Sequence, residues 1–83
     1  MTAERPILIV DDDAALRETL AEQLQVDKEF VATEAGTVSE AEAKVAARSA
    51  RFDAIILDVT LPDGDGRDLC ASFRKQGLRM PII

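Results

Sequence analysis

The chain has 83 residues, of which 16 are acidic and 10 are basic, so its formal net charge is −6. This length fits one small domain, and a hydrophobic content of 47% supports a packed core and excludes a disordered chain. The acidic balance argues against direct nucleic-acid binding by this segment, because neutralising phosphates requires a basic surface.

The chain contains one cysteine, Cys70, and no histidine. A disulfide within the chain and a Cys/His metal cluster are therefore excluded, and a reducing, cytoplasmic location is expected. Cys70 falls on the apolar face of an expected helix, which favours a packing role. The first six residues are too short and polar for a signal peptide, and the apolar runs are too short to span a membrane. No membrane partner is expected.

Four aliphatic residues, 7–10, run directly into Asp11, Asp12 and Asp13. A short, continuous apolar run is typical of a strand buried on both faces, as in parallel sheets. Residues 1–6 are expected to form a flexible start. Asp13 is predicted to cap the following helix, because its carboxylate can accept from the first free N–H groups.

That helix is predicted from Leu16, Leu20 and Leu24, whose spacing places them on one core-facing stripe. A shorter and more polar strand is expected over 30–35, at an edge of the sheet. A second helix should then begin after Thr37, its predicted cap, and extend to about Ala50.

The third predicted strand, 54–57, delivers another acid, Asp58, at its end. Residues 59–66 are rich in turn formers and are expected to be a loop in which Asp63 and Asp65 shape the turns. Two further elements complete the chain, a helix from near Arg67 to near Gly77 and the opening of a fourth buried strand over 80–83.

The order βαβαβαβ predicts an α/β fold with a parallel sheet and right-handed crossovers. If the first and third strands are neighbours, their ends lie about 5 Å apart, and Asp11, Asp12 and Asp58 converge. Carboxylate oxygens of this kind suit Mg²⁺. A carboxylate can also act as the nucleophile in phosphoryl transfer, forming an aspartyl-phosphate. The sequence thus predicts an acidic pocket at the carboxyl ends of two strands.

Three stretches in order, residues 7–12, 55–58 and 61–66, resemble the receiver (CheY-like) domain of two-component response regulators. The resemblance covers essentially the whole chain. It implies a flavodoxin-like sheet with strand order 2-1-3-4-5, and it makes residues 1–83 a single receiver domain of which this is the N-terminal portion.

The resemblance also implies roles for individual residues. Asp58 resembles the phosphoacceptor, Asp12 the direct Mg²⁺ ligand, and Asp11 the acid that assists through water or as a second ligand. Asp58 and the backbone carbonyl of Thr60 would complete the metal set. Gly66 is expected in a backbone conformation that a Cβ would disfavour. In the family, a sensor histidine kinase or phosphotransfer protein is the partner. The receiver is not an enzyme but assists its own modification.

The family also uses a Ser or Thr after strand four and a Lys after strand five, and this sequence stops at Ile83, before both. The lysines present, Lys28, Lys44 and Lys75, do not fall at predicted carboxyl ends of strands. Strand five and helices four and five are expected to be missing, so transfer to Asp58 should be slow or absent. The uncovered edge of strand four is expected to pair with a second copy of the chain.

Two alternatives remain at this point. A Mg²⁺-dependent phosphatase of the haloacid dehalogenase type would use the acids at 11–13 as an Asp-x-Asp motif, although it does not account for Asp58 and the turn-rich residues after it. A receiver-like interaction module would never carry phosphate.

Overall fold

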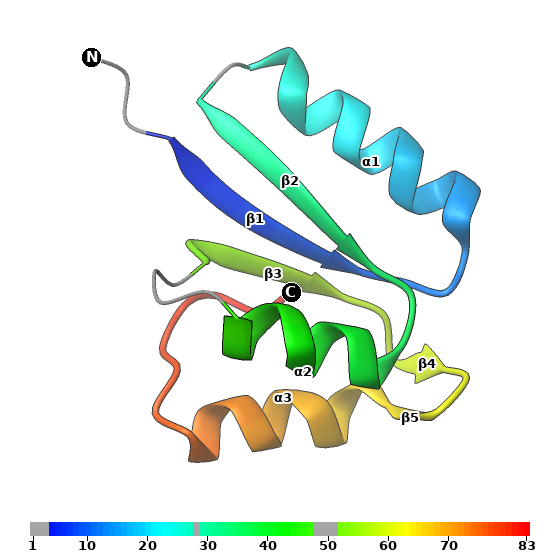
Figure 1. The fold of residues 1–83 in the computed structure, drawn as a ribbon, viewed down its shortest axis with the longest axis vertical. Coiled ribbons are helices and arrows are strands. Elements are labelled where there is room, and N and C mark those ends of the chain that lie inside the picture. The colour runs from blue at the N-terminus through cyan, green and yellow to red at the C-terminus, as the bar shows by residue number, and fades with distance from the viewer. Residues whose placement is uncertain (1–3, 28, 48–51) are drawn as a thin grey trace.

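A computed structural model describes residues 4–27, 29–47 and 52–83. Its elements in chain order are β1 (Arg5–Val10), α1 (Ala14–Val26), β2 (Phe30–Ala35), α2 (Val38–Ala47), β3 (Ala54–Leu57), β4 (Thr60–Leu61), β5 (Gly64–Asp65) and α3 (Gly66–Lys75). They form three layers, in which α1 covers one face of the main sheet and α2 and α3 cover the other (Figure 1). The predicted α/β class is confirmed.

The main sheet is parallel and has the order β2-β1-β3. Val10, the last residue of β1, lies opposite Ala35 in β2 and Leu57 in β3, so all three strands end at the same edge. The predicted edge position of β2 and the predicted contact between the first and third strands are both confirmed. This register places the residue after each strand at one rim of the sheet.

The predicted fourth strand is present only as a short pairing beside β3. One parallel bridge joins Ile55 to Ile82. The Ile55 amide donates to the Pro81 carbonyl, and the Ile83 amide donates to the Ile55 carbonyl, both at 2.9 Å. The pairing lies on the side of β3 away from β1, in agreement with the expected order, but it is too short to count as a strand.

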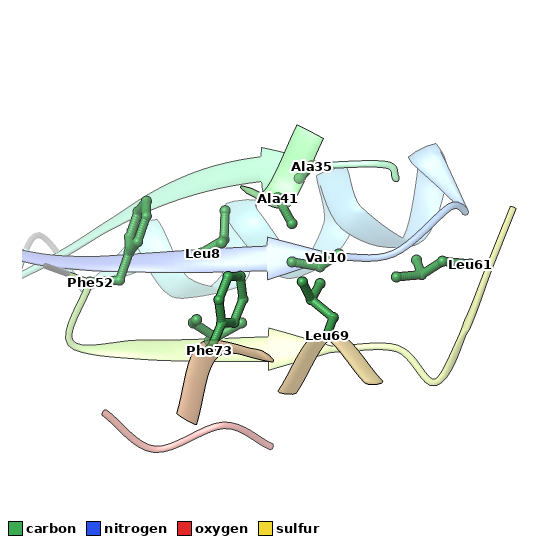
Figure 2. Close-up of a cluster of buried hydrophobic side chains, with 9 residues drawn as sticks. Leu8, Val10, Ala35, Ala41, Phe52, Leu61, Leu69 and Phe73 are labelled. Carbon is green, nitrogen blue, oxygen red and sulfur yellow. The ribbon is translucent and has the colours of Figure 1, made fainter. Parts of the chain in front are cut away.

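The side chains of β1 alternate between the two faces of the sheet. Leu8 and Val10 are fully buried under α2 and α3, while Ile7 and Ile9 are buried on the α1 side. Figure 2 shows Phe73 projecting from α3 toward Leu8 of β1. Burial on both faces explains why residues 7–10 of this strand are apolar without interruption.

The beginning of the chain is more ordered than expected. Arg5 and Pro6 belong to β1, and the Pro6 carbonyl accepts from the Asp53 amide at 2.8 Å. Proline has no N–H, but its carbonyl still pairs with a neighbouring segment. The predicted flexible start is therefore wrong for these two residues, and residues 1–3 lie outside the described part. The predicted end of the second helix near Ala50 also lies outside it.

The leucine stripe of α1 is only partly in the core. Leu20 and Leu24 pack against the cluster around Ile7 and Ile9, but Leu16 is 44% exposed. Leu16 lies in the first turn of α1, next to the rim where the strands end. The prediction that all three leucines are core residues is wrong for Leu16.

The predicted loop over 59–66 contains a small antiparallel hairpin, in which Thr60 pairs with Asp65 and Leu61 with Gly64. Leu61 is buried in the core cluster, so the hairpin is anchored by an apolar side chain.

Cys70 on α3 is half-buried, which is consistent with packing without full enclosure.

Candidate functional site

Backbone hydrogen bonds at the rim of the sheet fix the positions of the acids that follow β1 and β3. The Asp58 amide donates to the Val10 carbonyl at 2.9 Å, and the Asp11 amide donates to the Ala35 carbonyl at 3.0 Å. Asp11 thus continues the pairing of β1 with β2, while Asp58 continues the pairing of β3 with β1. Two residues far apart in the sequence are thereby held side by side.

The carboxylates of Asp11, Asp12 and Asp58 come together as the sequence predicts. Each offers an oxygen that lies within 4.8 Å of the others. Asp11 and Asp58 are half-buried and Asp12 is exposed. Three like charges at this separation repel one another, and a hard divalent cation with oxygen ligands would relieve that repulsion. The donor set therefore fits Mg²⁺ on chemical grounds.

Asp13 is separated from this cluster by its own local bonds. Its carboxylate accepts from the Leu16 amide at 3.1 Å, which makes it the N-cap of α1, as predicted. Its amide in turn donates to a carboxylate oxygen of Asp11 at 2.9 Å. Asp13 thus begins α1 as its N-cap, and its amide holds the side chain of Asp11 in place.

Thr60 meets Asp58 through its backbone. The Thr60 amide lies 3.4 Å from a carboxylate oxygen of Asp58, a long hydrogen bond that ties this side chain to the start of β4. The predicted ligand role of the Thr60 carbonyl stays a prediction.

Gly66 is required for a reason other than the expected one. Its φ is not positive; among the described glycines only Gly77 has that conformation. A Cβ on Gly66 would lie 2.0 Å from the carbonyl oxygen of Asp58. The Gly66 amide donates to the Val59 carbonyl at 2.6 Å, which holds the two segments together. Close backbone approach, and not backbone conformation, excludes a side chain here.

Asp63 and Asp65 do more than shape turns. Asp63 accepts from the amides of Val38 and Ser39 at 2.7 and 3.0 Å, so the hairpin caps α2 in addition to Thr37. Asp65 caps α3 through the Arg67 amide. Sequence spacing could not reveal the first of these caps, because donor and acceptor are about 25 residues apart.

The hydrogen bonds of these two capping residues lower the pKa values of their carboxyl groups. The Ser39 and Val38 amides lower the pKa of the exposed Asp63 carboxyl. The Arg67 side chain, followed by its amide, lowers the pKa of Asp65, and Asp65 raises the pKa of Arg67. Each carboxylate is thus favoured in its charged form, as a cap requires.

Sequence analysis also missed Arg17. Its guanidinium Nη1 donates to the Asp11 carbonyl at 2.6 Å, and its Nε pairs with Glu34 of β2 at 3.3 Å. An arginine in the first turns of a helix carries no signal of its own in the sequence, because its partners belong to two other segments.

A family model for the response regulator receiver domain matches residues 7–83. The chain belongs to this family. Receiver domains are signalling modules that interact with histidine kinases or phosphotransfer proteins, and they typically bind Mg²⁺ at an acidic site. The resemblance inferred from the three sequence stretches is confirmed, and the phosphatase alternative loses its basis.

Individual relatives agree with this assignment. The DNA-binding transcriptional activator DevR/DosR of Mycobacterium tuberculosis is 48% identical over 78 residues, which are 93% of this chain and 34% of that protein. The solved HemR receiver domain from Leptospira biflexa matches with a TM-score of 0.83 at 42% identity, over 95% of this chain and 61% of that one. The MaeR response regulator bound to beryllium trifluoride matches with a TM-score of 0.85 at 28% identity, over 95% and 64%.

The receiver chain thus spans about a third of the length of the curated relative and about three fifths of the solved chains. In the parts of the chain that the structure describes, no helix is both long and apolar enough to cross a membrane.

Proposed function

We propose that this chain is a phosphoacceptor receiver domain in which Asp58 accepts a phosphoryl group and Asp11, Asp12 and Asp58 hold Mg²⁺, together with the Thr60 carbonyl. One observation carries the proposal: three carboxylate oxygens from the ends of two adjacent parallel strands lie within 4.8 Å of one another. Ligands of α/β sheets bind at this rim.

Each residue has a distinct part. Asp58 is the nucleophile by its resemblance to the phosphoacceptor of the family. It follows β3, is half-buried at the rim, and accepts a long hydrogen bond from the Thr60 amide. Asp11 and Asp12 supply the charge that attracts the cation. When bound, Mg²⁺ would neutralise charge on the transferred group. The solved MaeR response regulator is bound to beryllium trifluoride, an anion shaped like a phosphoryl group, which supports an anion-accepting site on this fold.

The donor is proposed to be a histidine kinase or phosphotransfer protein in the cytoplasm. In the transfer, a carboxylate oxygen of Asp58 forms the new P–O bond, and the P–N bond of the donor's phosphohistidine breaks. Direct nucleic-acid binding by this segment is not proposed, since its net charge is −6. We also propose that residues 1–83 belong to a single receiver domain.

Transfer within these 83 residues is proposed to be slow. Lys44 and Lys75 lie in the last turns of α2 and α3. Helices that follow parallel strands begin at the carboxyl rim, so their last turns lie at the opposite rim, away from Asp58. Lys28 lies outside the described residues. A cation that would hold the phosphoryl oxygens is therefore not supplied by Lys44 or Lys75.

The test is incubation with acetyl phosphate and Mg²⁺, followed by intact mass spectrometry. We expect the native chain to gain one phosphoryl group slowly and Asp58→Asn to gain none. Asp53→Asn, which neutralises an exposed acid just before β3, should label like the native chain. Labelling that persists in Asp58→Asn would exclude Asp58 as the acceptor, and no labelling at all would favour an interaction module. Rapid labelling would contradict the proposed slowness only.

We further propose that two copies of this chain associate through the edge formed by residues 81–83. Among the described residues, no strand pairs with this segment on the side away from β3, and Ile83 is 79% exposed. An open, apolar edge is a template for pairing. Light scattering should then show a dimer at micromolar concentration, and a clean folded monomer would contradict this.

A further inference from the structure

Arg17 joins three segments at the rim of the sheet. It lies near the start of α1, its Nη1 donates to the Asp11 carbonyl at 2.6 Å, and its Nε pairs with Glu34 near the end of β2 at 3.3 Å. Its side chain is only 19% exposed. A planar guanidinium can bind two acceptors in fixed directions, which an ammonium cannot do.

The turn after β2 leaves room for this guanidinium. A Cβ on Gly36 would lie 3.0 Å from Nη1 of Arg17 and 3.3 Å from a carboxylate oxygen of Glu40. The Gly36 amide donates to that Glu40 oxygen at 2.6 Å. The missing side chain at Gly36 lets the guanidinium reach the Asp11 carbonyl from the β2 side.

The hydrogen bond from Arg17 is the third that holds Asp11 in place. Its amide is held by the Ala35 carbonyl, and one carboxylate oxygen accepts from the Asp13 amide. The bond from Arg17 to the Asp11 carbonyl restricts rotation of the peptide group between Asp11 and Asp12. It thereby favours one orientation of the backbone from which both side chains extend.

The ion pair with Glu34 reduces the effect of the Arg17 charge on the acidic cluster. A free guanidinium beside three carboxylates would neutralise part of the charge that attracts a cation. The Glu34 carboxylate pairs with Arg17 at 3.3 Å and offsets part of that positive charge. The effect of Arg17 on the cluster therefore passes through the hydrogen bond to the backbone.

We propose that Arg17 is a positioning residue, which holds the Asp11–Asp12 peptide so that both carboxylates face Asp58. This inference rests on the proposed cation site. Residues that orient metal ligands through a hydrogen bond change metal affinity by about 10- to 100-fold when they are replaced.

The test is a Mg²⁺ titration of the 83-residue chain followed by amide NMR shifts. Arg17→Gln should weaken binding by about tenfold while the spectrum without Mg²⁺ stays that of a folded protein. Arg17→Lys keeps the charge but reaches one acceptor at a time, so we expect an intermediate affinity. If Arg17→Gln does not fold, the affinity of Arg17→Lys decides.

The matched control is Arg5→Gln. Arg5 pairs with Glu29 at the opposite end of β1, so this variant makes the same change of net charge away from the site. We expect its affinity to equal that of the native chain. Native affinity in both Arg17 variants would overturn the positioning role alone. The absence of saturable Mg²⁺ binding in the native chain would overturn the proposed function, and this inference with it.

Discussion

At the scale of single residues, Gly66 shows most directly how packing constrains the site. Its Cα lies against the backbone of Asp58, and the added carbon of an alanine would lie 2.0 Å from the Asp58 carbonyl oxygen. Backbone cannot give way as a flexible side chain can. The position of the proposed phosphoacceptor is thus linked to the absence of a side chain eight residues later.

Gly66→Ala should therefore lower the free energy of unfolding by about 2–3 kcal/mol, the upper range for overpacking in a tight site. It should also shift the amide resonances of Asp58 and Val59. Denaturant unfolding measures the first effect. Gly64→Ala is the control, because its Cβ would meet a methyl group of Val38 at 3.1 Å, which can move. Equal stability of the two variants would contradict this account.

The acids of the site could be predicted from the sequence, but the residues that support them could not. Asp11, Asp12 and Asp58 follow apolar runs whose pairing can be inferred, so their convergence was predictable. Arg17 and Asp63 act across segments, and only the folded chain reveals their partners. The resemblance to receiver domains supplied the proposed roles, which geometry alone does not.

At the scale of elements, the hairpin β4–β5 connects the site to α2. Asp63, between its two strands, accepts from the Val38 and Ser39 amides at the start of that helix. A carboxylate at a helix N-terminus satisfies free N–H groups and is favoured by the helix dipole. The segment that follows Asp58 is thereby fixed to the start of α2.

Asp63→Asn should lower the melting temperature at neutral pH by roughly a few degrees. Asp63 accepts the Val38 and Ser39 amides with its two different carboxylate oxygens, and asparagine keeps only one acceptor oxygen. The amides of Ser39 and Val38 hold the pKa of Asp63 below its ordinary value of 3.8. The stabilisation is therefore fully present above pH 3.8 and is lost as the pH falls through the lower, folded-state pKa.

Melting curves of both proteins across pH 2–7 test this prediction. The difference between them should be constant near neutrality and shrink at the acid end. A difference that grows as the pH falls would contradict the cap. Glu42→Gln, an exposed acid within α2, is the control and should behave like the native chain.

The elements themselves were predictable to different degrees. Residues 7–10 of β1 and all of β3 are apolar because both faces of the sheet are covered. α3 presents Leu69 and Phe73 to the core at helical spacing. The hairpin was missed because its strands have two residues each and its turn composition resembles an open loop. The expected flexible start was wrong for Arg5 and Pro6, which belong to β1, because the Pro6 carbonyl accepts from the Asp53 amide.

At the scale of the whole molecule, the parallel sheet accounts for the site. Two strands that end in register at one rim bring acids 47 positions apart to within 4.8 Å, since Asp58 follows Asp11 by that number in the sequence. Folding this cluster against its own repulsion requires the core beneath it, in which Leu8, Val10 and Ile55 are fully buried. The central claim is that this cluster binds a divalent cation.

A Mg²⁺ titration monitored by thermal unfolding tests that claim most directly, because a ligand that binds only the folded state raises its stability. Asp12→Asn and Asp13→Asn remove the same charge from adjacent exposed positions, and asparagine caps a helix about as well as aspartate. We predict that the native chain and Asp13→Asn gain melting temperature with Mg²⁺ to a plateau, while Asp12→Asn does not. Equal responses of Asp12→Asn and Asp13→Asn would contradict the account.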